Sequence, residues 1–222
     1  MKSMIVTGAG SGLGKELSLL LAKKNFHLIL TGRKNSKLMA VKKEIEALGG
    51  NADILELDVS NEDDATRNIN TLCKQFDVYG LINNAGVGHF GPIVELNSME
   101  IKEMIETNVL GTIYLTRALL PHLNKGHIIN IISTAGLRGK INESVYAASK
   151  FAVRGFTESL QKEYQGSGIK FTAVYMGGMD TPFWENTDHI KDPSRLRPAG
   201  EIAETIVNKM DEDSIIIESK KP

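Results

Sequence analysis

The chain has 222 residues, of which 41% are hydrophobic and 24% are charged. This composition excludes a fibrous or intrinsically disordered chain, and the length favours one large domain over two small ones. Because 26 Lys and Arg residues nearly balance 27 Asp and Glu residues, for a net charge of -1, no global charge favours binding to nucleic acid or to an anionic membrane.

Short apolar runs alternate along the chain with longer stretches whose apolar residues recur at helical spacing. We expect strands at 4–7, 27–31, 52–57, 81–83, 127–133 and 170–175. The helices between them are expected at 13–24, 36–48, 62–76, 98–123 and 144–165. Such repeated strand–helix units predict an α/β fold, a Rossmann-type doubly wound parallel sheet with helices on both faces.

Residues at the expected helix ends agree with these boundaries. Ser60 or Asn61 is expected to cap the third helix and Ser98 the fourth, because their side chains can accept a hydrogen bond from a free backbone N–H. Gly49 and Gly50 are expected to end the second helix, since glycine readily closes a helix.

The stretch 181–199 differs in composition from the rest of the chain, since it holds three of the six prolines and has no clear periodicity. A stretch of this length inside a compact domain is typical of a functional lid or a disordered loop. After it we expect a last helix near 200–210 and a final strand at 214–218. The whole chain, 1–222, is then expected to be a single domain.

The chain has one cysteine, Cys73, which cannot form an internal disulfide, so we expect a small buried thiol. Five scattered histidines without clustered acids predict no metal site, and His89 and His189 fit polar loop residues. No run approaches the roughly 18 consecutive apolar residues that span a bilayer. The first expected strand begins at Met4, which leaves no room for a signal peptide, and we expect a cytoplasmic protein without a membrane segment.

A glycine-rich turn follows the first expected strand, where residues 7–14 read TGAGSGLG. Its glycines allow a tight turn and let a pyrophosphate approach the backbone N–H groups of the next helix, whose dipole favours negative charge. Because the turn lies between a strand and a helix, it predicts a dinucleotide site in preference to a simple tight turn. The residues expected to bind the dinucleotide here are Gly8, Ser11, Gly12, Leu13 and Gly14.

The second expected strand ends in Thr31, Gly32 and Arg33. NAD-binding Rossmann folds place a carboxylate here to hold the 2'-hydroxyl of the adenosine ribose, and this chain has none. Arg33 can instead grip a 2'-phosphate through two parallel hydrogen bonds. We therefore expect NADP(H) in preference to NAD(H), although Arg33 and Lys34 also fit solvated charges at the start of a helix.

Tyr146 and Lys150 lie one turn apart on the same face of an expected helix. An adjacent ammonium stabilises a phenolate, so Lys150 is expected to lower the pKa of Tyr146 toward the working range of a proton donor. Such a pair by itself is more often structural than catalytic. The glycine-rich turn, together with Ser133 at the carboxyl end of a strand, favours the catalytic interpretation, because doubly wound folds bind ligands at that edge.

Together these motifs resemble the short-chain dehydrogenase/reductase family, from Thr7 to about Thr181. The matching residues are the glycine-rich turn, Asp58, Val59, Asn83, Asn84, Ala85, Gly86, Asn108, Ser133 and the segment from Tyr146 to Lys150. The resemblance implies cofactor contacts at the adenine by Asp58 and Val59, along the cofactor by Asn84, Ala85 and Gly86, and at the carboxamide by Thr181. Asn108 would bend its helix and hold a water. Without the other motifs, Asn83 and Asn84 also fit a capped turn, and Asn108 a tolerated polar residue in a long helix.

The resemblance implies an NADP(H)-dependent oxidoreductase that transfers a hydride between the nicotinamide and a small carbonyl compound or secondary alcohol. Tyr146 would be the general acid/base, Ser133 would orient the carbonyl oxygen, and Lys150 would hold the nicotinamide ribose. Asn108 would support a water relay to Lys150. The alternative is a non-catalytic module on the same fold that senses NADPH and reports to a partner. A sugar-nucleotide epimerase is disfavoured, because the chain after Thr181 is too short for a substrate domain.

The expected substrate pocket draws on the loop 88–92, on Leu137, and on Phe183 and Trp184 of the lid. These side chains favour an apolar or aromatic carbonyl compound, or else a lid that covers the nicotinamide alone.

Two departures from the family pattern bear on these expectations. Met176 replaces a usual proline, so the backbone that meets the nicotinamide is expected to be less rigid. The usual glycine-rich C-terminal ending is missing, which favours a homodimer and leaves a tetramer open. We expect the dimer to form through the helices 98–123 and 144–165, whose apolar surplus also fits ordinary core: Ile113, Leu115, Phe151, Val153 and Phe156.

Overall fold

The computed structural model describes residues 1–185, 187 and 189–219. Asn186 and Asp188 of the expected lid, and residues 220–222 of the expected domain, lie outside the described residues. Within the described part of the chain, no helix is long and apolar enough to cross a membrane.

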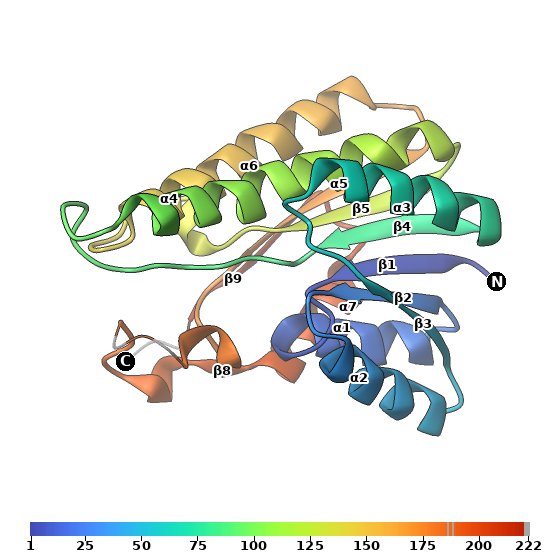
Figure 1. Ribbon diagram of the computed structural model, residues 1–222, viewed down its shortest axis with the longest axis horizontal. Helices are drawn as coiled ribbons and strands as arrows, with labels where there is room; N and C mark the ends of the chain where they lie inside the picture. The colour runs from blue at the N-terminus through green and yellow to red at the C-terminus, as the bar shows by residue number, and fades with distance from the viewer. Residues whose placement is uncertain (186, 188, 220–222) are drawn as a thin grey trace.

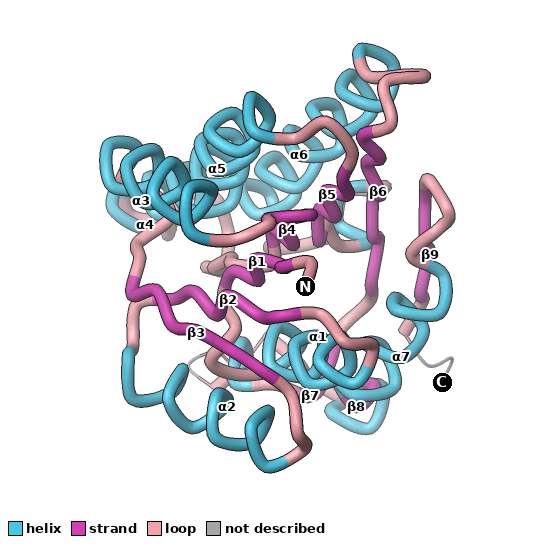
Figure 2. Tube along the Cα trace, turned by 90° about the vertical axis from the view of Figure 1, so that its right-hand side faces the viewer, coloured by secondary structure: helices cyan, strands magenta, loops and turns pink. Residues whose placement is uncertain are grey.

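The central sheet has the strand order β3–β2–β1–β4–β5–β6–β9, and every neighbouring pair is parallel (Figures 1 and 2). The order reverses between β1 and β4, which creates the crevice where doubly wound sheets bind ligands. This arrangement confirms the predicted Rossmann-type α/β fold. The strands are β1 (Ser3–Thr7), β2 (His27–Gly32), β3 (Asn51–Glu56), β4 (Val78–Asn83), β5 (Gly126–Ile131), β6 (Ile169–Met176) and β9 (Ser214–Ile217).

Helices cover both faces of the sheet. Figure 1 shows α3, α4, α5 and α6 above it and α1, α2 and α7 below it. The helices are α1 (Gly12–Lys23), α2 (Asn35–Ala47), α3 (Glu62–Gln75), α4 (Ser98–Ile105), α5 (Gly111–Leu119), α6 (Ser144–Glu163) and α7 (Ala199–Lys209).

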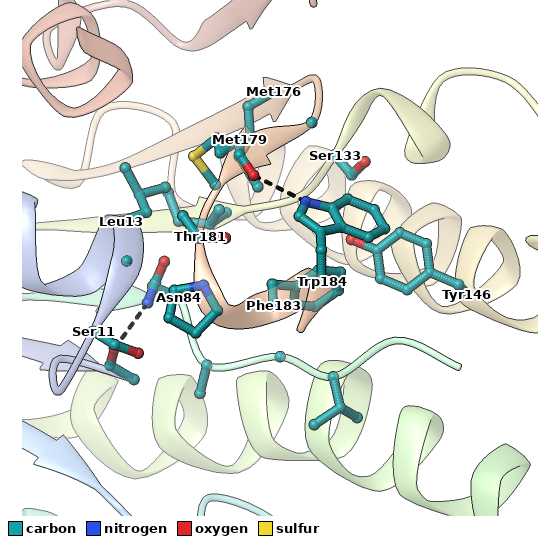
Figure 3. Close-up of a pocket in the computed structure, with 18 of the residues that line it drawn as sticks. Ser11, Leu13, Asn84, Ser133, Tyr146, Met176, Met179, Thr181, Phe183 and Trp184 are labelled. Atoms are coloured by element: carbon teal, nitrogen blue, oxygen red, sulfur yellow. Dashed lines mark hydrogen bonds between the residues drawn. The ribbon is translucent and has the colours of Figure 1, made fainter. Parts of the chain in front are cut away.

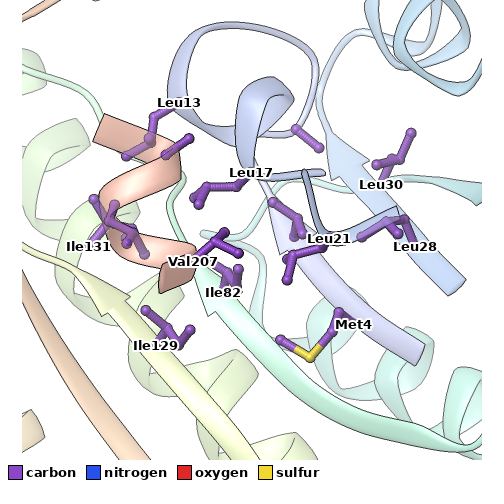
Figure 4. Close-up of a cluster of buried hydrophobic side chains, with 14 of the residues drawn as sticks. Met4, Leu13, Leu17, Leu21, Leu28, Leu30, Ile82, Ile129, Ile131 and Val207 are labelled. Carbon is purple, nitrogen blue, oxygen red and sulfur yellow. The ribbon is translucent and has the colours of Figure 1, made fainter. Parts of the chain in front are cut away.

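The two faces of the sheet carry separate apolar cores, because successive side chains of a strand point to opposite faces. In β1, Met4 and Val6 pack with Leu17 of α1, whereas Ile5 between them packs on the other face, with Leu115 of α5. Figure 4 shows the first of these cores between β1, β2 and the helices α1 and α7. Burial on both faces explains why these strands are continuous apolar runs and do not alternate with polar residues.

Two predicted helix boundaries need correction. The fourth helix is capped by Asn97 and not by Ser98: the Asn97 side chain accepts hydrogen bonds from the backbone, and Glu100 bonds back to the Asn97 N–H. The predicted helix 98–123 is interrupted by a π-helical turn at Glu106–Leu110, and it ends in a 3₁₀ turn. The other predicted caps agree with the structure, since Asn61 caps α3 and Gly49 follows α2 with a φ of +80°.

The lid 181–199 and the two residues before it contain local structure that the sequence pattern did not predict. A two-residue strand β7 (Met179–Asp180) pairs in parallel with β8 (Arg197–Pro198) at the two ends of the lid. Between them lie two 3₁₀ turns, Pro182–Trp184 and Pro193–Arg195. The proline-rich composition of the lid is therefore used in turns that begin with proline.

Candidate active site

A cavity of about 1160 Å³ opens where the carboxyl ends of β1, β2, β4, β5 and β6 meet (Figure 3). It is larger than the roughly 300–1,000 Å³ of ordinary small-molecule sites, which suits a ligand of dinucleotide size. Of the site residues predicted from the sequence, Gly14 and Asn108 do not line it. Those that do are Gly8, Ser11, Gly12, Leu13, Arg33, Asp58, Val59, Asn84, Ala85, Gly86, Ser133, Tyr146, Lys150 and Thr181.

The glycine-rich turn needs its glycines for two different reasons. Gly8 and Gly12 adopt left-handed conformations, with φ of +63° and +53°. A Cβ on Gly14 would lie 2.4 Å from the carbonyl oxygen of Gly8, so Gly14 allows α1 to pack closely and does not face the cavity. The side chain of Ser11 makes no capping hydrogen bond, and the first turn of α1 holds no acid. The backbone N–H groups at the start of α1 can therefore donate hydrogen bonds to an anion.

Thr7 joins the glycine-rich turn to the loop after β4. Its Oγ1 accepts hydrogen bonds from the backbone N–H groups of Asn84 and Ala85, both at 2.8 Å. The Asn84 side chain donates back to the Thr7 carbonyl oxygen at 2.8 Å. Asn83 instead ties β4 to its neighbours through the side chains of Thr116 and Asn130. This role of Thr7 could not be predicted from the sequence, because a threonine at a strand end has no distinctive pattern.

Positive charge gathers where the adenosine end of a dinucleotide would lie. Arg33, Lys34 and Lys37 line the cavity close to Gly32 and Asp58. Arg33 lies 3.5 Å from a carboxylate oxygen of Glu103, and both side chains are largely exposed, so this ion pair is weak. Lys37 is a residue of the cavity that the sequence pattern did not predict. A Cβ on Gly10 would touch its side chain, which places Lys37 directly over the glycine-rich turn.

Ser133, Tyr146 and Lys150 surround one end of the cavity. Ser133 follows β5, whose predicted length to 133 is too long: the strand ends at Ile131, and the Ser133 hydroxyl caps a 3₁₀ turn. Lys150 donates a hydrogen bond of 3.1 Å to the carbonyl oxygen of Ile131, and its Nζ lies 5.7 Å from the centre of the Tyr146 ring. The three side chains come from two elements, and the sheet edge brings them together.

The pKa of Tyr146 is raised above its ordinary value, mainly by burial. The nearby Ser133 hydroxyl acts in the opposite direction, and the negative charge of Glu143 raises the pKa further. Burial lowers the pKa of Lys150 to about 8. The prediction that Lys150 lowers the pKa of Tyr146 toward the working range is therefore wrong for this structure, because burial of the phenol raises that pKa.

Asn108 lies behind the cavity, in the π-helical turn between α4 and α5. Its side chain accepts a hydrogen bond from the Val87 N–H at 2.8 Å, and it donates to the Val87 carbonyl and to Ser149 Oγ at 2.9 and 3.0 Å. A Cβ on Gly86 would lie 3.2 Å from Asn108 Oδ1 and 3.7 Å from Lys150 Nζ. Asn108 thus holds the loop after β4 against the helix that carries Tyr146.

The expected substrate pocket is correct for Phe183 and Trp184 only, because the loop 88–92 and Leu137 do not line the cavity. Phe90 instead packs under the lid, with ring centres 5.2 Å from Trp184 and 5.4 Å from Tyr146. The indole of Trp184 donates a 2.9 Å hydrogen bond to the Met179 carbonyl oxygen (Figure 3). Leu137 belongs to a separate apolar cluster on β6 and α6.

The backbone after Met176 is held by the C-terminal strand. Gly177 N–H bonds to the Ile217 carbonyl oxygen at 2.8 Å, and Gly178 N–H bonds to Ser219 Oγ at 3.2 Å. A Cβ on Gly177 would lie 2.3 Å from Ser219 Oγ, so the contact requires glycine. These bonds oppose the loss of rigidity that was expected from the replacement of proline by methionine.

Comparison with known proteins identifies the family. The sequence profile of the short chain dehydrogenases matches residues 2–192. An uncharacterized oxidoreductase of Staphylococcus epidermidis is 33% identical over 193 residues, which cover 84% of this chain and 82% of that protein. The chain belongs to the short-chain dehydrogenase/reductase family. Retinol dehydrogenase 8 of Homo sapiens is 35% identical to this chain, over 82% of this chain and 60% of that protein.

Solved structures of the family superpose on this chain over nearly its whole length. An alcohol dehydrogenase from Thermococcus sibiricus, complexed with 5-hydroxy-NADP, has a TM-score of 0.88 and 25% identity and covers 100% of this chain and 99% of its own. A short-chain dehydrogenase from Sphingobium yanoikuyae in complex with NADPH has a TM-score of 0.89, 23% identity, and coverage of 98% and 87%. A family member from Burkholderia phymatum in complex with NAD has a TM-score of 0.87 and 23% identity, with coverage of 98% and 88%. The last two likenesses show the fold alone.

Proposed function

We propose that this dehydrogenase is an NADP(H)-dependent carbonyl reductase, which is reversibly an alcohol dehydrogenase. The observation that carries the proposal is the meeting of Ser133, Tyr146 and Lys150 in the same cavity as the glycine-rich turn. A protein that only sensed the cofactor would have no use for a buried tyrosine beside a lysine and a serine.

The residues of the cavity fit a nicotinamide dinucleotide. The uncapped N–H groups of α1 suit the pyrophosphate, because the left-handed Gly8 and Gly12 leave no side chain in the way. Arg33, Lys34 and Lys37 suit a 2'-phosphate, and no carboxylate occupies the end of β2. Similar structures contain NADP(H) or NAD, so the preference for NADP(H) rests on these three cations. The remaining cofactor contacts are assigned to Asp58, Val59, Asn84, Ala85, Gly86 and Thr181.

The bound cofactor supplies a hydride to the carbonyl carbon of the substrate. Tyr146 donates the proton to the carbonyl oxygen, and the raised pKa keeps this phenol protonated at neutral pH, as reduction requires. Ser133 donates a hydrogen bond to the same oxygen and fixes its position. Lys150 stabilises the phenolate that remains, and it holds the nicotinamide ribose. Asn108 keeps the loop at Val87 and the helix α6 in register, and we assign it the support of a water relay to Lys150.

We also propose that the protein is a cytoplasmic homodimer, and a tetramer remains open. Only part of the apolar surplus expected on the long helices is ordinary core, since Leu115 and Val153 are buried. Phe151 on α6 stays 41% exposed and is available for contact with a second copy.

The experiment that tests the function follows NADPH oxidation by purified protein with a panel of aldehydes, ketones, diketones and quinones, and with NADH in parallel. We expect turnover of at least one carbonyl class, with NADPH preferred. Tight binding of NADPH without turnover of any compound would contradict the reductase function and favour a cofactor sensor.

A further inference from the structure

Glu143 places a buried carboxylate beside the proposed acid. It precedes α6, three residues before Tyr146, and its side chain is only 7% exposed and lines the cavity. Glu143 is the N-cap of α6, and its charge acts on the Tyr146 phenol, so the two side chains lie near each other in the same cavity. Glu143 therefore faces the space where a carbonyl compound must lie to reach the Tyr146 hydroxyl.

Only one oxygen of this carboxylate is fully used. Glu143 Oε1 lies 2.9 Å from Nε2 of His189, which comes from the lid. Lys140 Nζ lies 3.9 Å from Oε2, beyond hydrogen-bonding distance. Among the described residues, no donor forms a hydrogen bond to Oε2. Oε2 is not among the buried polar atoms that lack a partner in the described part of the chain, and Glu143 lines the cavity, so a donor from a ligand can reach this oxygen.

The bond to His189 by itself does not account for this arrangement. His189 is already held by Phe90, whose ring stacks on the imidazole at 4.5 Å and 13°. The charge of Glu143 also disfavours ionisation of the neighbouring Tyr146. A lid anchor would serve equally well without a second free oxygen and without a charge beside the phenol.

We infer that Glu143 is a specificity-determining residue, whose Oε2 accepts a hydrogen bond from a hydroxyl or ammonium group carried by the substrate within a few bonds of the reacting carbonyl. This inference rests on the proposed reductase function. It replaces a purely apolar substrate by a polar one, in which the aromatic rings of Phe183 and Trp184 cover the carbon skeleton and Glu143 reads the donor group. An apolar ketone would offer Oε2 no hydrogen-bond donor.

Three small ketones that differ in one group test the inference: hydroxyacetone, aminoacetone and 2-butanone carry a hydroxyl, an ammonium and a methyl at the same position. With NADPH, we expect kcat/KM of the wild-type protein to be at least ~10-fold higher for the hydroxyl or the ammonium compound than for 2-butanone. Comparison of the first two compounds distinguishes the hydroxyl from the ammonium.

Variants separate a specificity role from a structural one. In Glu143→Gln the preference over 2-butanone, measured as the ratio of two kcat/KM values in the same variant, should fall about 10-fold. Any effect of the lost charge on Tyr146 acts on all three ketones alike and cancels in this ratio. Glu163→Gln, an exposed acid at the end of the same helix, should change nothing. His189→Gln tests the lid: an equal loss for all three ketones in both Glu143→Gln and His189→Gln would reduce Glu143 to a lid anchor and overturn the inference.

A binding measurement keeps the inference testable if the reductase function fails. If no ketone oxidises NADPH, thermal stabilisation of the protein with NADP⁺ is measured with propane-1,2-diol, 1-amino-2-propanol and 2-butanol. Preference for one of the first two, lost in Glu143→Gln, supports the donor site without the reaction. Equal stabilisation by all three alcohols, or a preference that survives in Glu143→Gln, overturns it.

Discussion

Tyr146 lies among groups that set its proton affinity in opposite directions. Burial and the charge of Glu143 raise the pKa, and the Ser133 hydroxyl lowers it. Because the pKa is raised overall, the phenol is protonated at neutral pH and can serve as a proton donor. Lys150, whose pKa burial lowers to about 8, is the cation closest to the ring in the proposed mechanism.

Replacement of the phenol tests its role directly. Tyr146→Phe keeps the ring and removes the proton, so we expect kcat to fall at least ~100-fold, with NADPH affinity nearly unchanged. Tyr164→Phe at the end of the same helix is the control and should keep full activity. Steady-state kinetics measure kcat, and fluorescence titration measures the affinity for NADPH. Near-normal turnover of Tyr146→Phe would remove this residue from the mechanism.

Arg33 is one of the three cations on which the proposed cofactor preference rests. Because Arg33→Ala removes a charge that would bind the 2'-phosphate, which NADH lacks, we expect KM for NADPH to rise about 10- to 100-fold and KM for NADH to change less than about threefold. Lys43→Ala, an exposed lysine of α2 away from the cavity, should leave both constants unchanged. Equal losses for both cofactors would show that Arg33 does not read the phosphate.

At the scale of elements, helix α1 connects the fold to the site. Its N-terminus carries the glycine-rich turn, and its buried face packs Leu17 and Leu21 against β1. The same helix contacts α7, which follows the lid. The position of the anion-binding N–H groups is therefore set by core packing.

Truncation of that core should lower stability. Leu17 is fully buried, so Leu17→Ala is expected to reduce the free energy of unfolding by about 2–5 kcal/mol, from lost burial and a residual cavity. Leu48→Ala, at a position 54% exposed after α2, should cost less than about 1 kcal/mol. Urea unfolding compares the two variants, and a similar cost for both would contradict the assignment of Leu17 to the core.

The pair β5 and β6 contains a histidine that should make stability depend on pH. Burial lowers the pKa of His127 to about 4, Lys170 adds to this effect, and Asp211 opposes it. In the unfolded chain His127 binds a proton near its ordinary pKa of 6.5, whereas in the folded protein it binds a proton only near pH 4. This contribution to stability is thus complete above about pH 6.5 and is lost as the pH falls toward 4.

Comparison with a variant isolates that contribution. His127→Gln keeps a donor for Thr172, whose hydroxyl lies 2.9 Å from His127 Nε2, and it cannot titrate. Between pH 7 and about pH 4.5, we expect the wild-type protein to lose about 2–3 kcal/mol more stability than the variant. If the free energy of unfolding, measured in urea, changes with pH equally in the two proteins, His127 is not the source of the pH-dependent loss of stability.

At the scale of the whole molecule, the proposed homodimer rests on apolar surface that the helices leave exposed, such as Phe151 on α6. Sedimentation velocity at micromolar concentration is expected to give a dimer, and Phe151→Asp should shift it toward monomer. Met39→Asp is a matched control, because Met39 of α2 is 42% exposed against 41% for Phe151 and lies on the other face of the sheet. Monomer alone in the wild-type protein, or equal dissociation by both variants, would contradict an interface through α6.

Local sequence pattern predicted the elements well wherever one physical cause acts within a few residues. Buried parallel strands are apolar on both faces, so central strands such as β1 and β2 appeared as short apolar runs, whereas the edge strand β9 alternates between exposed and buried residues. Local sequence pattern did not predict the local structure where contacts with residues distant in the sequence determine it. Asn108 sits in a π-helical turn because Val87 and Ser149 bond its side chain, and neither residue is near it in the sequence.

The sequence by itself determined the parallel doubly wound sheet, the family, and most residues that line the cavity, because glycines with special conformations and motif spacing are local properties. Tertiary structure alone decided the rest. Lys37 lies at the end of the cavity near Arg33, and Phe90 packs against Trp184 of the lid. Glu143 contacts His189, which lies 46 residues away in the sequence. The direction of the pKa shift of Tyr146 also depended on the tertiary structure, because desolvation exists only once the surrounding chain has folded over the phenol.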